Sequence, residues 1–588
     1  MTGEGMPIPT ISAPSASALR RIATTFALLC SVSAQAQTAA PVAPAAPAAS
    51  TPVAPAAPAA LGPLGELTVK VDQPGAVINR DIFGQFAEHL GNGIYGSIWV
   101  GKESRIPNVR GVRSDVVSAL KAIKVPVVRW PGGCFADEYH WRDAIGPVAK
   151  RKTTVNSVWA GAVEPNTFGT HEFMDFAEQI GSEAYISVNV GSGTVQEAAD
   201  WVEYMTAVAP ASAAKERAAN GRKAPYKVKY LGIGNEMWGC GGPYTGEEYV
   251  TKMKTFAHFV HNYNPAQAAP KIDFSLIAKD LMAGKPMDSL PSNPEGMKFV
   301  AAGPNSADPS YTEVIMKAWK TRSPIYWDIN GISLHQYTWG SLPFNEPAEG
   351  FGEKEYATVL MQSQWMDRTV TKHSAIMDKY DPKKHVALVV DEWGVWLKPK
   401  EGTEQMFLIQ QNSLRDGMAA AINLNIFARH ADRVRMTNIA QMVNVLQAMI
   451  MTEGPKMVLT PTYHVYKMYV PFQDATLLPV TFNAGEYKFD KITLPKVDAL
   501  AARGKDGKVW LALVNLDPNA ESVVKANVPG VSASRAEGEV LTAPSFASVN
   551  TFDAPATVAP KPVAATARNG VVSLTLPPHS VTVVRLEP

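Results

Sequence analysis

Residues 228–242 have the sequence VKYLGIGNEMWGCGG, an apolar run that stops at Gly-Asn-Glu and continues into glycines. A short apolar run that ends this abruptly is typical of a buried parallel strand. In a barrel, the carboxyl ends of such strands form the face on which active sites are built. We therefore expect Glu236 to present a carboxylate at that face, with Asn235 beside it.

The same pattern recurs along the chain from Leu67 onward, where short apolar runs alternate with stretches of helical spacing. A doubly wound sheet would alternate in the same way, but no G-x-G-x-x-G turn follows the first run. The pattern therefore predicts an α/β fold, a (β/α)8 TIM barrel over residues 81–455. The eight expected strands are Ile82–Glu88, Val125–Trp130, Ala184–Val190, Val228–Asn235, Lys298–Ala302, Ile329–His335, Val386–Asp391 and Val434–Ala440.

A second domain is expected after the barrel, because helical periodicity fades near Pro455 and short β-like runs follow. Asp506-Gly507 is a hairpin signal between two of these runs. Residues 456–588 are therefore predicted to form an antiparallel β-sandwich, jelly-roll-like in type. The β-like segment Leu67–Val71, within residues 65–80, is expected to add a strand to that sandwich.

The first 64 residues are expected to lie outside the fold. Arg20-Arg21 precede an apolar segment, and Ala34-Gln35-Ala36 has the form of a cleavage site, so residues 1–36 are predicted to be a signal peptide. The Ala/Pro-rich residues 37–64, in which PVAPAAPAA occurs twice, predict an extended linker. These features predict an exported protein, periplasmic or extracellular. No other apolar segment is typical of a membrane span.

Composition argues against several partners. Lys and Arg number 55 against 54 Asp and Glu, and no long basic run occurs, so neither nucleic acid nor an anionic membrane is expected to bind. After cleavage the chain would keep Cys134 and Cys240, which form no Cys/His zinc pattern. One disulfide and two buried thiols are both compatible with this pair. No metal and no other cofactor is predicted.

Two Glu residues stand at the ends of strong strand runs, Glu236 and Glu392. They are far apart in sequence but would meet at the mouth of a barrel. Glycoside hydrolysis needs such a pair, one acid to protonate the leaving oxygen and one carboxylate opposite it. Asn235 is placed to hydrogen-bond a sugar 2-hydroxyl. A purely structural role for the two Glu residues is the alternative interpretation.

These motifs together resemble glycoside hydrolase family 51, the retaining α-L-arabinofuranosidases. The resemblance extends over roughly residues 80–470 and implies the barrel with its sandwich, no cofactor, and exo-acting hydrolysis of terminal α-L-arabinofuranosyl residues. It also implies a homo-oligomer, since members are often hexamers. The matching stretches are Ile82–Gly91, Val128–Pro147, Glu164–Phe173, Asn189–Tyr204, Tyr230–Gly242, Ile332–Trp339, Val390–Gly394 and Ala431–Thr452.

The resemblance also implies a role for individual residues. Glu236 would be the general acid/base, and Glu392 the nucleophile that forms an arabinosyl-enzyme. Cys134 stands where many members have an Asn that touches the substrate, although a thiol is a poorer hydrogen-bond partner. The residues predicted to bind substrate or to order the two carboxylates are Glu88, Arg129, Cys134, Asn235, His335, Tyr337 and Gln441.

Two other functions fit the same sequence. The first is another glycosidase of this fold, a β-xylosidase or an endoglucanase, which product analysis would distinguish. The second is a non-catalytic sugar-binding protein of the cell envelope. The intact pair Glu236 and Glu392 argues against it, because binding alone requires neither carboxylate.

Overall fold

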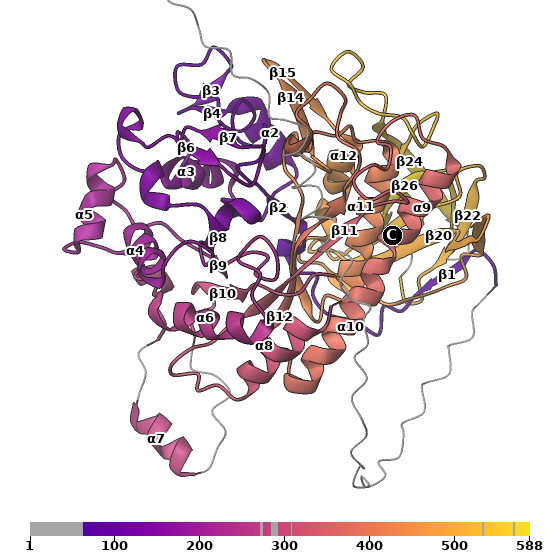
Figure 1. Ribbon diagram of the computed structural model, residues 1–588. Helices are drawn as coiled ribbons and strands as arrows, with labels where there is room; N and C mark the ends of the chain where they lie inside the picture. The colour runs from indigo at the N-terminus through magenta and orange to yellow at the C-terminus, as the bar shows by residue number, and fades with distance from the viewer. Residues whose placement is uncertain are drawn as a thin grey trace, which may run out of the picture. The chain divides into compact units, whose positions relative to one another are not determined.

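The eight predicted strands form a closed parallel barrel in the computed structural model, which confirms the predicted fold class (Figure 1). The structure describes residues 63–270, 274–283, 292–306, 308–531, 534–568 and 571–587. The predicted signal peptide and all but two residues of the predicted linker lie outside these ranges. The barrel strands are β2 (Gly84–Phe86), β5 (Val127–Trp130), β8 (Glu183–Val188), β9 (Tyr230–Ile233), β10 (Lys298–Ala301), β11 (Gly331–Thr338), β12 (Ala387–Val395) and β13 (Val434–Ile439).

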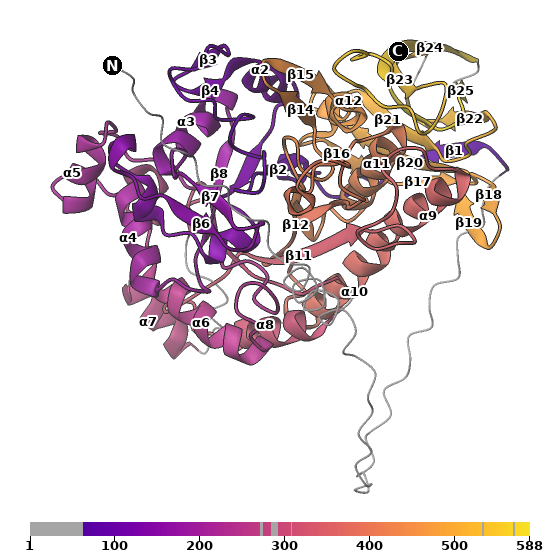
Figure 2. The ribbon, with the colours of Figure 1, turned by 45° about the horizontal axis from the view of Figure 1, so that its top comes forward.

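Helices surround the barrel strands in both ribbon views (Figures 1 and 2). The stretch of helical spacing between β11 and β12 forms two helices, which meet at Gln364. The helices are α2 (Ser114–Ala122), α3 (Thr170–Ile180), α4 (Val195–Thr206), α5 (Ser212–Ala219), α6 (Gly246–Phe259), α7 (Phe274–Met282), α8 (Ser310–Lys320), α9 (Glu353–Ser363), α10 (Trp365–Tyr380), α11 (Leu414–Arg429) and α12 (Pro461–Met468).

Helix α11 is buried on every side except at its last residue. Its burial places it in the interior, where it joins the barrel to the sandwich. Asn425 and Arg429 both donate hydrogen bonds to the Asp498 carboxylate of β20 (Val497–Arg503). The apolar core around α11 also continues into sandwich residues such as Val514. The two parts therefore share one core.

The interior of the barrel contains an apolar layer that supports the charged residues at its mouth. Val127, Tyr185, Tyr230, Val300 and Met436 belong to this layer, and all are buried. The hydroxyl of Tyr185 donates a hydrogen bond to a carboxylate of β12. The layer fills the barrel, as side chains do in barrels of this kind, so the chemistry is confined to one end.

The C-terminal domain consists of antiparallel strands with one addition from the N-terminal region. β1 (Glu66–Val69) pairs parallel with β22 (Ser522–Asn527) and antiparallel with β17 (Val480–Phe482), and Figure 1 shows it beside β22. Leu67 and Val69 are fully buried there. The other strands of this sheet are β16 (Thr476–Leu478), β20, β21 (Val509–Asn515), β23 (Arg535–Thr542), β24 (Ala559–Arg568), β25 (Val571–Leu576) and β26 (Ser580–Glu587).

Short hairpins extend some of the loops outside the barrel and the sandwich. The hairpin of β6 (Thr154–Asn156) and β7 (Ala162–Glu164) follows β5 and carries Trp159 in its turn. Trp159 is nevertheless buried, so the hairpin folds back over the barrel mouth. The other hairpins are β3 (Asn108–Val109) with β4 (Val112–Arg113), β14 (Ile450–Glu453) with β15 (Lys456–Leu459), and β18 (Glu486–Phe489) with β19 (Ile492–Pro495).

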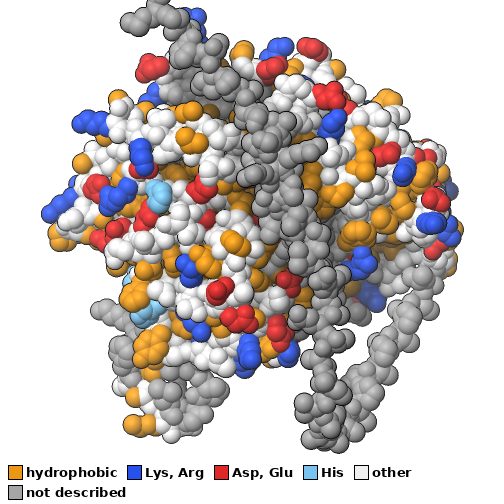
Figure 3. All heavy atoms as spheres, viewed as in Figure 1, with side chains coloured by type: hydrophobic (Ala, Val, Ile, Leu, Met, Phe, Trp, Pro, Cys, Tyr) orange, Lys and Arg blue, Asp and Glu red, His pale blue; other side chains and the backbone are white. Residues whose placement is uncertain are grey.

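The face of the molecule seen in Figure 3 shows acidic and basic side chains interspersed. This distribution accords with the near balance of charges in the sequence, and it gives that face no extended field of one sign. Within the described ranges, no helix is both long enough and apolar enough to cross a membrane.

Candidate active site

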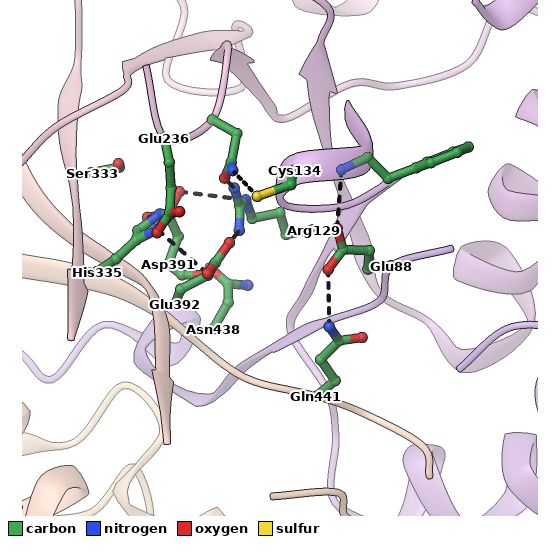
Figure 4. Close-up of polar contacts among 12 residues, drawn as sticks. Glu88, Arg129, Cys134, Glu236, Ser333, His335, Asp391, Glu392, Asn438 and Gln441 are labelled. Atoms are coloured by element: carbon green, nitrogen blue, oxygen red, sulfur yellow. Dashed lines mark hydrogen bonds and ion pairs between the residues drawn. The ribbon is translucent and has the colours of Figure 1, made fainter. Parts of the chain in front are cut away.

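Glu236 lies on a tight turn immediately after β9. Gly234 begins the turn with φ of +79°, and a Cβ atom there would lie 2.4 Å from the sulfur of Met237, so only glycine fits. The carbonyl oxygen of Glu236 then accepts hydrogen bonds from the N–H groups of Gly239 and Gly241. The sequence thus turns the chain sharply and leaves the Glu236 carboxylate at the barrel mouth (Figure 4).

Two consecutive acidic residues of β12, Asp391 and Glu392, both face the interior of the barrel. Side chains of a regular strand alternate between its two faces, so the strand must be irregular here. Ser333 of β11 pairs with Val389, whereas His335 pairs with Glu392, which leaves one extra residue in β12. This β-bulge re-aims one side chain and brings two neighbouring carboxylates to one place.

The Glu392 carboxylate is held by three neighbours. Arg129 donates to its Oε1 at 2.8 Å, Tyr337 donates to its Oε2 at 3.1 Å, and Nδ1 of His335 lies 3.4 Å from Oε2. One oxygen of Glu392 and one oxygen of Glu236 lie within 4.8 Å of each other. A nearest approach within 4.8 Å is compatible with the ~5–5.5 Å between the carboxyl groups of retaining glycosidases.

Asp391 is the buried partner of the same cations. Its carboxylate accepts a hydrogen bond from the Tyr185 hydroxyl at 2.7 Å and lies 3.3 Å from Nε2 of His335 and 3.5 Å from Nε of Arg129. Burial raises the pKa of Asp391, but the positive charges of Arg129 and His335 outweigh burial and hold the pKa below its usual value. Asp391 is therefore a permanent negative charge beneath the site.

His335 connects all three carboxylates. Its Nδ1 contacts Oε1 of Glu236 at 2.9 Å, and its Nε2 faces Asp391. Burial lowers the pKa of His335, but the negative charges of Glu392, Asp391 and Glu236 overcome burial and raise that pKa to about 10. The imidazole is therefore protonated at neutral pH, with both nitrogens as donors.

The Glu236 carboxyl has a raised pKa, mainly because it is buried and secondarily because Glu392 is negative; His335 and Arg129 partly oppose the rise. The raised pKa favours the protonated form of Glu236, whereas Glu392 accepts hydrogen bonds from Arg129 and Tyr337. Two carboxyl groups in different protonation states are what an acid and a nucleophile require.

Glu88 forms the opposite side of the site. Its carboxylate accepts hydrogen bonds from the Phe135 N–H, the Trp159 indole and the Gln441 side-chain amide, each at 3.1 Å. Figure 4 shows the bond from Gln441. Burial and the negative charge of Glu392 raise the pKa of Glu88 to about 7. Trp159 was not among the predicted site residues, and no regular spacing in the sequence links it to Glu88.

Asn235 is held between Arg129 and two sulfur atoms. Its Oδ1 accepts a hydrogen bond from Arg129 at 2.5 Å, and its amide nitrogen lies 3.6 Å from Sγ of Cys240 and 4.0 Å from Sγ of Cys134. The two cysteines form a disulfide in the structure, with sulfur atoms 2.00 Å apart. Of the two alternatives left by the sequence, the structure has the disulfide, and its Cys240 end is exposed.

Three aromatic side chains that the sequence did not predict as site residues, Trp339, Phe344 and Trp396, lie together beside Tyr337, which contacts Glu392. Tyr337 packs edge-on against Trp396, and Trp396 stacks on Trp339 with ring centroids 4.9 Å apart. Phe344 contacts both tryptophan rings. These side chains come from β11, the loop after β11 and the residue that follows β12, so only the folded chain reveals that they adjoin.

The structure brings all of the predicted site residues to one end of the barrel, and their roles stay predictions. Contacts connect them in two groups, one around Arg129 and one around Glu88, and the glycines after β5 separate the groups. A Cβ atom on Gly133 would lie 2.7 Å from Oε1 of Glu392, so this position needs glycine. The residues are Glu88, Arg129, Cys134, Asn235, Glu236, His335, Tyr337, Glu392 and Gln441.

Two clusters of potential metal ligands occur in the described ranges, and neither suits a metal. The first is Cys134, Glu236 and Cys240, but a disulfide leaves no thiolate to bind. The second is Glu236, His335 and Glu392, in which the imidazole is protonated and donates to carboxylates. Metal binding would require a neutral imidazole.

Two family models match the chain. The α-L-arabinofuranosidase 1 domain matches residues 119–293, and the α-L-arabinofuranosidase C-terminal domain matches residues 391–580. The first range contains Arg129 and Glu236, and the second contains Glu392 and Gln441.

Similar proteins cover most of the chain. An intracellular exo-α-L-arabinofuranosidase of Bacteroides ovatus is 41% identical over 524 residues, which is 89% of this chain and 95% of that protein. The crystal structure of the GH51 arabinofuranosidase from Xanthomonas axonopodis pv. citri is 48% identical, with a TM-score of 0.81 over 89% of this chain and 99% of the other. An α-L-arabinofuranosidase from Thermotoga maritima, solved with arabinose, is 28% identical with a TM-score of 0.73, and covers 89% of this chain and all of the other.

The prediction of an exported protein, periplasmic or extracellular, is wrong by this comparison. The Bacteroides ovatus relative, which is similar over nearly the whole chain, is named as an intracellular enzyme. The expectation came from residues 1–64 alone, of which the structure describes only Pro63 and Leu64. Neither a signal peptide nor secretion is therefore supported.

Proposed function

This chain belongs to glycoside hydrolase family 51, the α-L-arabinofuranosidases, and on that premise we propose that it hydrolyses terminal non-reducing α-L-arabinofuranosyl residues by exo action. Its substrates are arabinose-containing polysaccharides or oligosaccharides. The observation that carries the proposal is the pair Glu236 and Glu392, with one oxygen of each within 4.8 Å at the mouth of the barrel.

In the first step, Glu236 is the acid and Glu392 is the nucleophile. The protonated Glu236 gives its proton to the glycosidic oxygen while Glu392 attacks the anomeric carbon, and the aglycone leaves as an alcohol. Arg129 and Tyr337 each hold one oxygen of Glu392, which fixes the direction of attack. The product of this step is an arabinosyl ester of Glu392.

In the second step, Glu236 is the base. It is now a carboxylate, and the protonated His335 at 2.9 Å stabilises its negative charge. Glu236 removes a proton from water, the water oxygen attacks the anomeric carbon, and Glu392 leaves as a carboxylate. Two displacements at one carbon retain its configuration. Glu88, Gln441 and Asn235 are proposed to bind the sugar hydroxyl groups.

A substrate panel tests the proposed function directly. We expect turnover of 4-nitrophenyl α-L-arabinofuranoside, with kcat/KM at least about 100-fold above that for 4-nitrophenyl β-D-xylopyranoside, because the site must orient a furanose ring. Proton NMR of the first product should show the α anomer before it mutarotates, because the mechanism retains configuration. A preference for the xyloside or for internal cleavage of glucan would favour the alternative glycosidase. Absence of all turnover would favour the non-catalytic binding protein.

The pH dependence of kcat/KM should report the interaction of Glu236 with His335. His335→Gln removes a positive charge and a hydrogen bond, both of which lower the pKa of Glu236. That pKa should therefore rise, and the basic limb of the profile should move to higher pH. We also expect kcat/KM at the optimum to fall by about 10- to 100-fold, since Glu236 is less well placed.

The matched control for this histidine is His140→Gln. His140 is 45% exposed in its side chain and contacts only Glu197 among the acidic residues, so its variant should keep the wild-type profile. A basic limb that stays in place, or moves to lower pH, in His335→Gln would contradict the role given to His335.

Assembly as a homo-oligomer, a hexamer as in the family, stays a prediction. Sedimentation velocity of the purified protein measures it directly. A single monomeric species at micromolar concentration would contradict it.

A further inference from the structure

The turn η2 (Cys134–Asp137), which follows β5, contacts the chain on both sides of Glu236. We propose that η2 is a two-point clamp that positions the Glu236 carboxyl, and that Asp137 is a positioning residue for the reaction. The proposal rests on the proposed function of Glu236 as acid and base. Among the described residues, the Asp137 carboxylate accepts hydrogen bonds from backbone N–H groups and contacts neither Glu236 nor Glu392, so its effect acts through the backbone.

The first point of the clamp is the Asp137 carboxylate. Its Oδ1 accepts hydrogen bonds from the N–H groups of Val190 at 2.8 Å and Gly191 at 2.9 Å, at the end of β8. Its Oδ2 accepts the N–H of Asn235 at 3.0 Å, directly before Glu236. Asp137 is 3% exposed, so both oxygens are used inside the protein and the carboxylate joins the ends of β8 and β9 to η2.

The second point of the clamp is the disulfide from Cys134 to Cys240. It lies on the other side of Glu236 in the sequence and links η2 to the glycine-rich end of the turn. The Cys240 sulfur is 3.8 Å from Oε2 of Glu236 and 3.6 Å from the Asn235 amide nitrogen. Asn235, one residue before Glu236, and Cys240, four residues after it, are thus both tied to η2.

The contacts with η2 restrict a glycine-rich turn whose backbone is otherwise easy to deform. Gly234, Gly239, Gly241 and Gly242 give it more backbone freedom than any other residue type would. The next regular element, α6, begins only at Gly246. A general acid must stay within hydrogen-bond reach of the leaving oxygen, and a misplacement of about 1 Å can cost roughly 100-fold in rate.

The close packing of backbone against the Asp137 side chain of η2 supports the proposed clamp. A Cβ atom on Gly241 would lie 2.8 Å from Oδ2 of Asp137, and one on Gly191 would lie 2.8 Å from the Asp137 Cβ. The backbone carbonyl of Asp137 also accepts the N–H of Ser192 at 3.0 Å. The backbones therefore approach closely around this one side chain, and its replacement must move the Glu236 turn.

Asp137→Asn tests the first point of the clamp. The amide oxygen can keep the bonds to Val190 and Gly191, but the amide NH₂ then faces the N–H of Asn235, and two donors repel. We expect kcat/KM for methyl α-L-arabinofuranoside, whose alkoxide needs protonation, to fall about 30-fold. For 2,4-dinitrophenyl α-L-arabinofuranoside, whose leaving group departs without a proton, the fall should be under about 3-fold.

Cys240→Ser tests the second point by breaking the disulfide at its exposed end, which leaves Cys134 as a buried thiol. It should give the same leaving-group dependence with a smaller loss, about 5-fold on the methyl glycoside. The double variant Asp137→Asn/Cys240→Ser should lose more than the product of the two single losses, because either tie alone partly holds the turn. Asp143→Asn is the matched control, since among the described residues Asp143 forms its ion pair with the exposed Lys152, and it should behave as wild type.

Three outcomes would overturn the clamp. They are an equal loss on both glycosides, no loss on either, or strictly multiplicative losses in the double variant. If Asp137→Asn does not fold, as judged by circular dichroism, Cys240→Ser alone still decides between selective and unselective loss. Failure of the proposed function is distinct, because Glu236→Ala would then show no leaving-group dependence even though the wild type is folded.

Discussion

Glu392→Ala should lower kcat/KM for 4-nitrophenyl α-L-arabinofuranoside by about 10⁵-fold. A covalent mechanism without its nucleophile retains only the contribution of binding and of the remaining groups, and losses on this order accompany removal of a nucleophile in other enzymes. Arg129 and Tyr337, which contact Glu392 at 2.8 and 3.1 Å, would stay in place around an empty space. Steady-state kinetics with an excess of enzyme measure the residual rate.

Sodium azide makes this result specific to the role of Glu392. Azide can occupy the space left by the carboxylate and attack the anomeric carbon once, so the product should be the β-L-arabinofuranosyl azide, with inverted configuration. The matched control is Glu401→Ala, an exposed Glu with 86% side-chain exposure in the loop after β12. Near wild-type turnover of Glu392→Ala, or azide product of retained configuration, would refute Glu392 as the nucleophile.

Glu236→Ala should separate substrates by their leaving groups. General acid catalysis contributes roughly 10²- to 10⁴-fold, so kcat/KM for methyl α-L-arabinofuranoside should fall about 10³-fold. For the 2,4-dinitrophenyl glycoside it should fall less than about 10-fold, since no proton is needed. The second step lacks its base with either substrate, so the arabinosyl ester of Glu392 should accumulate and be visible by mass spectrometry of the intact protein.

Azide again distinguishes the two carboxylates. In Glu236→Ala it attacks the ester from the face that water uses, so the product should be the α-L-arabinofuranosyl azide, with retained configuration. The basic limb of the pH profile should also disappear, because Glu236 is the group whose raised pKa sets that limb. Glu247→Ala, an exposed Glu at the start of α6, is the control. A uniform loss on both glycosides would contradict the acid role.

The barrel and its two principal carboxylates were predictable because they depend on local patterns. Short apolar runs ending in polar residues predict parallel strands, and the topology of a barrel brings the ends of those strands together. Glu236 and Glu392 could therefore be paired across a long stretch of sequence. The start of α11 was less predictable: the helical pattern from Glu404 begins ten residues before the helix does, because Leu408 adopts a positive φ and residues before Ser413 form a loop.

Asp391 could not be assigned a role from the sequence, because the argument from alternation excludes it. If Glu392 faces the barrel interior, a regular strand turns Asp391 outward. The β-bulge in β12 interrupts the alternation of side chains, so Asp391 faces inward as well. The residue types of VVDEW do not predict a bulge. Trp159 escaped prediction for a different reason, since it reaches Glu88 from a hairpin turn with no periodic pattern.

Asp137 illustrates a third limit. It stands next to Glu138 in the sequence, and no spacing rule separates the two acids. Only the fold shows that Asp137 is buried against three backbone N–H groups, whereas Glu138 is partly exposed and binds Ser157. Contacts between side chains and the backbone of distant turns depend on tertiary packing, which sequence patterns do not encode at this level.

Strand β1 can pair with β22 only late in the synthesis of the chain. Its partner β22 ends at Asn527, roughly 450 residues after Val69, and at about 5–20 residues per second a ribosome needs on the order of half a minute to make that length. The barrel strands, from β2 to β13, are all synthesised in that interval. The first strand of the chain is thus one of the last to be placed, and until then Leu67 and Val69, fully buried in the finished protein, remain an exposed edge for chaperones to cover.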